Sequence, residues 1–195
     1  MQKGVVIFIT TVIILILTIG GLKLFLGQYS QNNPNQNMAK NESNNTRVLL
    51  ETNYGNITVE LRADQPITAG NFKSLVEEGI YNGVIFHRII PKFMIQGGDP
   101  TGTGYGDPSI PKIKDEFNGE QKNNRGTLAM ANAGPNTGSS QFFINLVNNN
   151  FLDGKHPVFA NVVEGMDVVY KIAAVDTGAN DKPIKPVTII KASVL

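Results

Sequence analysis

The chain has 195 residues, of which 41% are hydrophobic, and it carries a formal net charge of +1 and no cysteine. These values fit one globular domain with a modest extension. They exclude disulfides and cysteine-based zinc sites, and the absence of a long basic run argues against nucleic-acid binding. With only His87 and His156, a multi-histidine metal site is not expected.

The amino end is strongly apolar. Nineteen uncharged residues separate Lys3 from Lys23, and as a helix they would span about 28 Å at about 1.5 Å per residue. This nearly matches a hydrocarbon core of about 30 Å, so residues 1–27 are predicted to form an uncleaved, single-pass membrane anchor. The alternative is the signal peptide of a secreted protein, whose apolar region usually runs about 7–15 residues and ends at a small-x-small site. Gly20-Gly21 is a poor match to such a site.

The charges flanking this segment bear on its orientation. Lys3 and the amino terminus favour the cytoplasmic side, whereas Lys23, Lys40 and Arg47 beyond the segment pull the other way. A short, positively charged N-terminal segment before a single membrane span normally stays on the cytoplasmic side. We therefore expect the folded domain to lie outside the cytoplasm.

Residues 28–46 are highly polar, and ten of these nineteen are Asn or Gln. Such a segment cannot bury enough apolar surface to offset the entropy of ordering it. It is predicted to be a flexible linker, and the folded domain is predicted to occupy 47–195.

Short β-prone runs dominate the rest of the chain. Tyr54-Gly55-Asn56 is a hairpin signal between the first two runs. Thr68 is predicted to cap a helix that Gly79 ends, and residues 166–173 fit a second helix. The predicted strands are Val48–Asn53, Ile57–Leu61, Val84–Ile89, Phe93–Gln96, Leu128–Asn132, Phe142–Leu146, Val158–Val163 and Val187–Val194.

This pattern predicts a mainly β fold. Many short strands, glycine-rich turns and only two helices favour a barrel or sandwich over a parallel Rossmann sheet. The glycine-rich segment 97–119 is predicted to be an ordered surface loop. It is not a phosphate loop, because Asp107 replaces the last glycine of G-x-G-x-x-G and no helix pattern follows.

Two segments, 86–99 and 130–144, combine polar and large apolar side chains in a specific way. FHRIIPKFMIQGGD and MANAGPNTGSSQFFI both place groups that can hold a peptide carbonyl next to Phe or Met. This mixture suits a site that binds one apolar residue of a peptide and holds its amide by hydrogen bonds. It lacks the reactive groups expected of a hydrolase or a metalloenzyme.

Both segments resemble the signature segments of cyclophilin-type peptidyl-prolyl cis-trans isomerases. The resemblance covers essentially all of residues 47–195, including Thr52-Asn53-Tyr54-Gly55 and Asn71-Phe72, and is closest to the compact microbial forms. It implies a closed eight-stranded antiparallel β-barrel capped by two α-helices. It also implies an isomerase of X–Pro bonds, expected here to assist the folding of exported proteins, as a monomer and without a cofactor.

The resemblance also assigns residue roles. Arg88 is implied to be the catalytic arginine, and Gln96 the glutamine that binds substrate and supports it. Ala131 and Asn132 match the backbone clamp for the residue before proline, and His156 matches the histidine at the pocket edge. The implied proline-pocket walls are Phe93, Met94, Phe143 and Leu152, and the implied neighbouring subsite comprises Gln141 and the Gly102–Gly104 turn.

One position departs from the pattern of many animal relatives. Phe151 occupies a position where those proteins carry tryptophan, and phenylalanine keeps an apolar wall but lacks the indole N–H donor. The resemblance therefore implies retained activity with weaker cyclosporin binding.

Some of these residues also allow other interpretations. His87 should face away from Arg88 on a regular strand and is interpreted as structural. A serine hydrolase using Ser139 or Ser140 with His156 and Asp153 is disfavoured because no G-x-S-x-G motif is present. A tethered module that binds Pro-containing peptides but catalyses little stays open, since it would use the same pocket.

Overall fold

The computed structural model describes residues 46–118 and 120–195, which belong to one compact unit, Asn45–Leu195. Among these residues, no helix is long and apolar enough to cross a membrane. The predicted anchor at 1–27 and all but the last residue of the predicted linker at 28–46 lie outside the described part of the chain.

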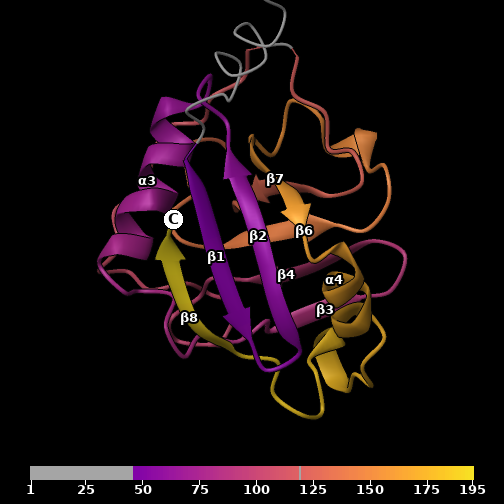
Figure 1. Ribbon diagram of the computed structural model, residues 1–195. Helices are drawn as coiled ribbons and strands as arrows, with labels where there is room; N and C mark the ends of the chain where they lie inside the picture. The colour runs from indigo at the N-terminus through magenta and orange to yellow at the C-terminus, as the bar shows by residue number, and fades with distance from the viewer. Residues whose placement is uncertain (1–45, 119) are drawn as a thin grey trace, which may run out of the picture. The chain divides into compact units, whose positions relative to one another are not determined.

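Eight strands form one antiparallel sheet in the order β3-β4-β6-β5-β7-β2-β1-β8, and two α-helices pack against it (Figure 1). The mainly β prediction with two helices is thus confirmed. The elements are β1 (Arg47–Thr52), β2 (Gly55–Leu61), α3 (Pro66–Glu77), β3 (Arg88–Ile90), β4 (Met94–Gly97), β5 (Thr127–Met130), β6 (Phe142–Asn145), the 3-10 turn η1 (Asn150–Leu152), β7 (Val158–Glu164), α4 (Met166–Ala173), the 3-10 turn η2 (Ala179–Asp181) and β8 (Ile189–Val194).

The prediction of a closed barrel is wrong, because continuous pairing stops at β3 and β8. The strand expected at Val84–Ile89 is formed only from Arg88 onward. Residues 78–87, which connect α3 to β3, make a single isolated bridge, between Ile85 and Thr188. Three backbone bonds of 2.8 Å still join residues 83–86 to residues 187–189. The sheet is therefore a curled half-barrel whose edges are linked by a short irregular segment.

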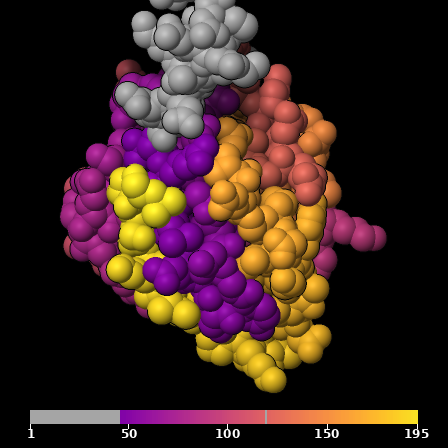
Figure 2. All heavy atoms as spheres, viewed as in Figure 1, coloured from indigo at the N-terminus to yellow at the C-terminus, as the bar shows by residue number. Residues whose placement is uncertain are grey.

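The predicted hairpin is confirmed between β1 and β2. The Thr52 hydroxyl donates to the carbonyl oxygen of Gly55 at 2.6 Å and accepts from the backbone N–H of Tyr54 at 3.1 Å, which fixes the turn. Gly55 has φ +129°, and a Cβ there would lie 2.9 Å from Val168 of α4. A larger residue at position 55 would therefore push α4 away from the hairpin. In Figure 2 this hairpin, in indigo, runs across the surface between yellow and orange segments.

Helix α3 begins three residues earlier than expected, with Gln65 rather than Thr68 at the N-cap position. Pro66 stands in its first turn, where its missing N–H costs nothing. The predicted cap Thr68 is instead a buried residue inside the helix, and its backbone N–H donates to the Glu116 carboxylate at 2.6 Å. The predicted end is confirmed, because Gly79 is left-handed at φ +75° and directly follows the C-cap.

Helix α4 has the predicted bounds. It buries Val168, Val169, Ile172 and Ala173, which follow the helical period. Gly165 precedes it at φ +84°, and a Cβ there would lie 2.2 Å from the Asn56 carbonyl oxygen, so only glycine fits.

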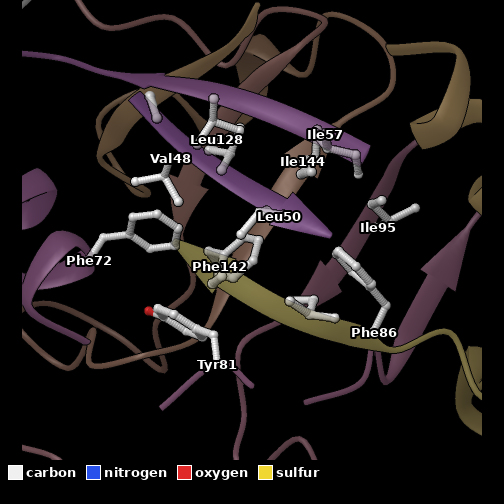
Figure 3. Packing of buried hydrophobic residues seen from close by; sticks show 14 of the residues in the cluster. Val48, Leu50, Ile57, Phe72, Tyr81, Phe86, Ile95, Leu128, Phe142 and Ile144 are labelled. Atoms are coloured by element: carbon white, nitrogen blue, oxygen red, sulfur yellow. The ribbon is translucent and has the colours of Figure 1, made fainter. Parts of the chain in front are cut away.

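Aromatic rings fill the space between α3 and the concave face of the sheet (Figure 3). Phe142 meets Phe72 edge to face at 5.4 Å between ring centroids, and it meets Tyr81 at 5.7 Å. The Tyr81 hydroxyl donates to the Ser140 carbonyl oxygen at 3.0 Å, and burial raises its pKa. Such edge-to-face contacts fix ring orientation as well as excluding water.

The core side of strands β3, β4, β6, β5 and β7 carries one continuous apolar row. Its members are paired directly across neighbouring strands, and all are fully buried. Because side chains alternate along a regular strand, the residues next to this row on β3, β4, β6 and β5 point to the opposite face. On β7 a register shift opposite Leu128 and Ala129 lets Val158, two residues from Ala160, take the corresponding place on that face. The row, called the inner row below, consists of Ile89, Ile95, Ile144, Leu128 and Ala160.

Candidate functional site

A second row runs over the other face of the same strands. Arg88 is paired with Gln96, Gln96 with Phe143, Phe143 with Ala129, and Ala129 with Val158. These five residues are called the outer row. Directly opposed residues share a face and bring their side chains within about 5 Å. The sheet register alone therefore places a cation, an amide and an aromatic ring side by side.

The outer row borders a cavity of about 200 Å³. Met94 and Phe143, 2% and 5% exposed, belong to a small apolar cluster on this face that is separate from the main core. Polar groups at the rim accompany this apolar cluster, an arrangement typical of small binding sites. The lining residues are Arg88, Phe93, Met94, Gln96, Ala131, Asn132, Phe143, Leu152 and His156, which are nine of the twelve site residues predicted from sequence.

A chain of side-chain amides continues from this cavity. Gln96 Nε2 donates to Gln141 Oε1 at 2.9 Å, and Gln141 Nε2 donates to the Gly104 carbonyl oxygen at 3.0 Å. This fixes the orientation of both amides and attaches the glycine-rich loop to the sheet. The Gln96 amide is thus engaged with Gln141, and the register also pairs Gln96 directly with Arg88, so its implied roles in binding substrate and supporting the arginine stay predictions.

Asp99 organises the same loop from inside. Its carboxylate accepts from the backbone N–H groups of Thr101 at 2.9 Å and Gly104 at 2.6 Å, and from the Thr101 hydroxyl at 2.8 Å. Burial alone would raise the pKa of Asp99, but these hydrogen bonds outweigh it and hold the pKa below its ordinary value. Residues 101–106 of the predicted loop are therefore held around a charged carboxylate.

His156 stands at the cavity edge with a defined tautomer. Its Nδ1 lies 3.2 Å from the Met130 carbonyl oxygen, and because a carbonyl only accepts, Nδ1 must donate. Burial lowers the pKa of His156, which favours the neutral ring. The ring meets Phe143 edge to face at 5.5 Å. His156 therefore offers Nε2 as an acceptor.

Arg88 has a partner that the sequence did not suggest. Its Nε lies 3.5 Å from a carboxylate oxygen of Asp181, which belongs to η2, 93 positions further along the chain. No local motif predicts this pair, because only the fold brings η2 beside β3.

The whole domain matches a family model. The model describes "Cyclophilin type peptidyl-prolyl cis-trans isomerase/CLD" and matches residues 47–194. The chain belongs to the cyclophilin-type peptidyl-prolyl cis-trans isomerase family.

Curated relatives agree with this cyclophilin assignment. The peptidyl-prolyl cis-trans isomerase ppi1 of Schizosaccharomyces pombe is 51% identical over 152 residues, which cover 76% of this chain and 98% of the relative. The isomerase CYP18-2 of Arabidopsis thaliana is 47% identical over 161 residues, covering 80% and 98%. The predicted reaction class, peptidyl-prolyl cis-trans isomerisation, is confirmed.

Solved structures agree as well. A cyclophilin-type isomerase of Cryptosporidium parvum matches with a TM-score of 0.74 and 35% identity, covering 77% of this chain and 98% of its own. The structure of that isomerase in the presence of the dipeptide Ala-Pro matches with a TM-score of 0.73 and 35% identity, covering 76% and 98%.

Three predicted site residues of this cyclophilin lie outside the cavity lining. Phe151, 64% exposed, stacks on Phe93 with ring centroids 5.8 Å apart, so it extends the apolar wall outward. Gln141 and Gly102 belong to the adjoining loop connection, where the Gly102 N–H donates to the Asp99 carbonyl oxygen at 2.9 Å.

His87 does not line the cavity and is 7% exposed. The regular strand assumed for it is absent, because Phe86 and Ile89 both belong to the main core. Its ring lies against Gly104, and burial lowers its pKa.

The geometry contradicts the serine-hydrolase alternative. The His156 Nδ1 is directed at Met130, and the Asp153 carboxylate binds the backbone N–H of Asn123 at 2.7 Å. Ser140 is fully buried. An acid–histidine–serine relay is not assembled.

Proposed function

We propose that this cyclophilin catalyses X–Pro rotation in the cavity beside the outer row, with Arg88 as the catalytic group. The observation that carries the proposal is the sheet register, which sets the Arg88 guanidinium beside an apolar cavity rimmed by amides. Phe93, Met94, Phe143 and Leu152 would hold the proline ring. Gln96, Asn132 and His156 would bind the flanking peptide groups.

The chemistry needs no nucleophile. Rotation about X–Pro meets a barrier of about 20 kcal/mol, because the amide loses conjugation as it twists. In the twisted form the proline nitrogen carries a localised lone pair and becomes a hydrogen-bond acceptor. Arg88 would donate to that lone pair, an interaction that the planar amide cannot offer, so it would favour the transition state over both ground states. A gain of about 7 kcal/mol would accelerate exchange about 10⁵-fold.

The test is X–Pro exchange in a short peptide, measured by NMR with residues 46–195. The yeast relative is matched over 98% of its length, so this segment corresponds to an entire relative. We expect exchange to be fast and to collapse in Arg88→Ala while the circular dichroism spectrum is unchanged. Bound peptide without exchange above background in the wild-type protein would refute catalysis and favour a tethered peptide-binding module.

We also propose that residues 1–27 anchor the domain outside the cytoplasm, where it would act as a monomer on exported chains. The apolar length between Lys3 and Lys23 supports the anchor. Protease added to intact cells should remove the domain, and complete protection would contradict this orientation. The missing indole at Phe151 supports weak cyclosporin binding, which nanomolar inhibition would contradict.

A further inference from the structure

The chain between α4 and β8 forms a short hairpin whose tip reaches the catalytic arginine. The Gly178 N–H donates to the Lys182 carbonyl oxygen at 2.8 Å, and the Ile184 N–H donates to the Asp176 carbonyl oxygen at 3.0 Å. Residues 176–184, called the tip hairpin below, are thus held by their own backbone ladder. In Figure 1 this segment continues from α4 toward β8.

Its tip has an unusual backbone conformation. Asn180 and Asp181 are both left-handed, with φ +59° and +58°. Non-glycine residues seldom adopt this conformation, and Asn and Asp tolerate it best because of their short polar side chains. The conformation fixes the direction in which Asp181 leaves the tip.

The tip is attached to two parts of the site. Asp181 approaches Arg88 Nε at 3.5 Å, and Lys182 Nζ donates to the Gly102 carbonyl oxygen at 3.5 Å. The Arg88 and Asp181 side chains are 44% and 48% exposed. Without a partner, a side chain as long and exposed as Arg88 would sample several rotamers.

We propose that Asp181 is a positioning residue for the isomerase reaction. By engaging Nε of Arg88, it restricts the side chain and leaves the two terminal nitrogens of the guanidinium free to face the cavity. Arginine can make both contacts at once because its five donors form a rigid planar fork. The proposal rests on the proposed role of Arg88 in catalysis.

The pair should position the cation rather than neutralise it. At 3.5 Å in a half-exposed setting, solvent screens the interaction, and exposed pairs of this kind are weak. The transition state would therefore still meet a cation, but one already aligned, and alignment of preorganised donors is what lowers the barrier.

The first experiment compares Asp181→Asn with a matched control, Asp176→Asn, in the same hairpin. Asn tolerates the left-handed conformation, so the change removes the charge with little backbone strain. We expect kcat on an uncharged Pro peptide to fall about fivefold with KM nearly unchanged, because the interaction acts in the transition state. Asp176→Asn should behave as wild type. An unchanged or raised kcat in Asp181→Asn would overturn the proposal.

A second measurement separates positioning from a merely structural role. The ¹⁵N relaxation of the Arg88 Nε–H group should show an ordered side chain in the wild type and a mobile one in Asp181→Asn. Added salt should lower the kcat of the wild type toward that of Asp181→Asn, because salt screens the ion pair. The kcat of Asp181→Asn should not change with salt concentration. Equal Arg88 mobility in both proteins would refute the positioning role.

These readouts also separate this proposal from the proposed function. If the wild-type protein lacks exchange activity, the proposed role of Arg88 in catalysis is wrong, even if ¹⁵N relaxation shows an Arg88 side chain ordered by Asp181. If the wild type is active but Asp181→Asn matches it, only the role of Asp181 fails. Should Asp181→Asn unfold, Asp181→Gly keeps the left-handed backbone and also removes the carboxylate.

Discussion

Gln141 should determine how firmly the glycine-rich loop is held beside the cavity. Its side chain accepts from Gln96 and donates to the Gly104 carbonyl oxygen. Gln141→Glu keeps the shape and the acceptor but replaces the donor with an oxygen. At neutral pH that oxygen would carry negative charge and face the Gly104 carbonyl oxygen.

The expected cost follows from these two contacts. A lost neutral hydrogen bond costs about 0.5–1.5 kcal/mol, and a carbonyl left without its donor can bring the loss to about 1–3 kcal/mol. The Gln141–Gly104 contact is partly buried, so an intermediate value applies. We expect the free energy of unfolding at pH 7 to fall by about 2 kcal/mol.

The penalty should depend on pH. A protonated carboxyl regains an O–H donor for Gly104, so the folded variant favours the protonated form, and the pKa of the new carboxyl should exceed its ordinary value of about 4.3. A raised pKa in the folded state means that stability is present at low pH and is lost as pH rises through that pKa. The variant should therefore approach wild-type stability near pH 4 and diverge above it.

Urea unfolding of both proteins between pH 4 and pH 8 measures this difference directly. The matched control is Gln141→Met, which removes both hydrogen bonds and adds no titrating group, so its penalty should be the same at every pH. A pH-independent penalty in Gln141→Glu would show that the Gly104 contact does not hold the loop.

Three further changes test other parts of the structure. Arg88→Lys keeps the charge but loses the fork, so kcat should fall about 10–100-fold, the value of one charge-assisted hydrogen bond, with Arg62→Lys as a surface control. Activity within twofold of wild type would contradict the role of Arg88. Asp99→Asn removes a carboxylate whose pKa is lowered on folding. Such a group adds to the free energy of unfolding above its unfolded pKa of about 3.9, and this contribution is lost as pH falls through the folded pKa. The variant should lose about 1–3 kcal/mol at pH 7 and show a shallower acid dependence in urea titrations, whereas an unchanged acid dependence would contradict the account of the loop. Phe142→Ala should lose about 3–5 kcal/mol in the same assay, because its ring is fully buried among other rings, and a loss below about 1 kcal/mol would contradict that packing.

Local patterns predicted the elements whose signals lie within a few residues. The β1–β2 hairpin and both bounds of α4 follow from short apolar periods and from the turn residues beside them. The end of α3 at Gly79 is equally local, because a left-handed glycine ends a helix wherever it is placed.

The predictions from sequence were wrong or incomplete where a feature depends on a residue far away along the chain. The start of α3 depends on Glu116, 48 positions from Thr68, and the open sheet edge depends on how residues 83–86 meet residues 187–189. The nine cavity residues came from motif resemblance, whereas Asp181 has no motif, since the tip hairpin alone brings it to Arg88. Propensity and periodicity carry no information about such long-range meetings.

The inner and outer rows share the same five strands, and this has a consequence for folding assays. A slip of one residue in the β3–β4 or β4–β6 pairing would turn Ile89, Ile95 or Ile144 toward the cavity and Arg88, Gln96 or Phe143 toward the core. A misregistered chain would thus lose the cavity and the core together, leaving no state that is stably packed but catalytically altered. Recovered isomerase activity after refolding would therefore count molecules with correct strand alignment, a property that circular dichroism, which reports only secondary-structure content, does not measure.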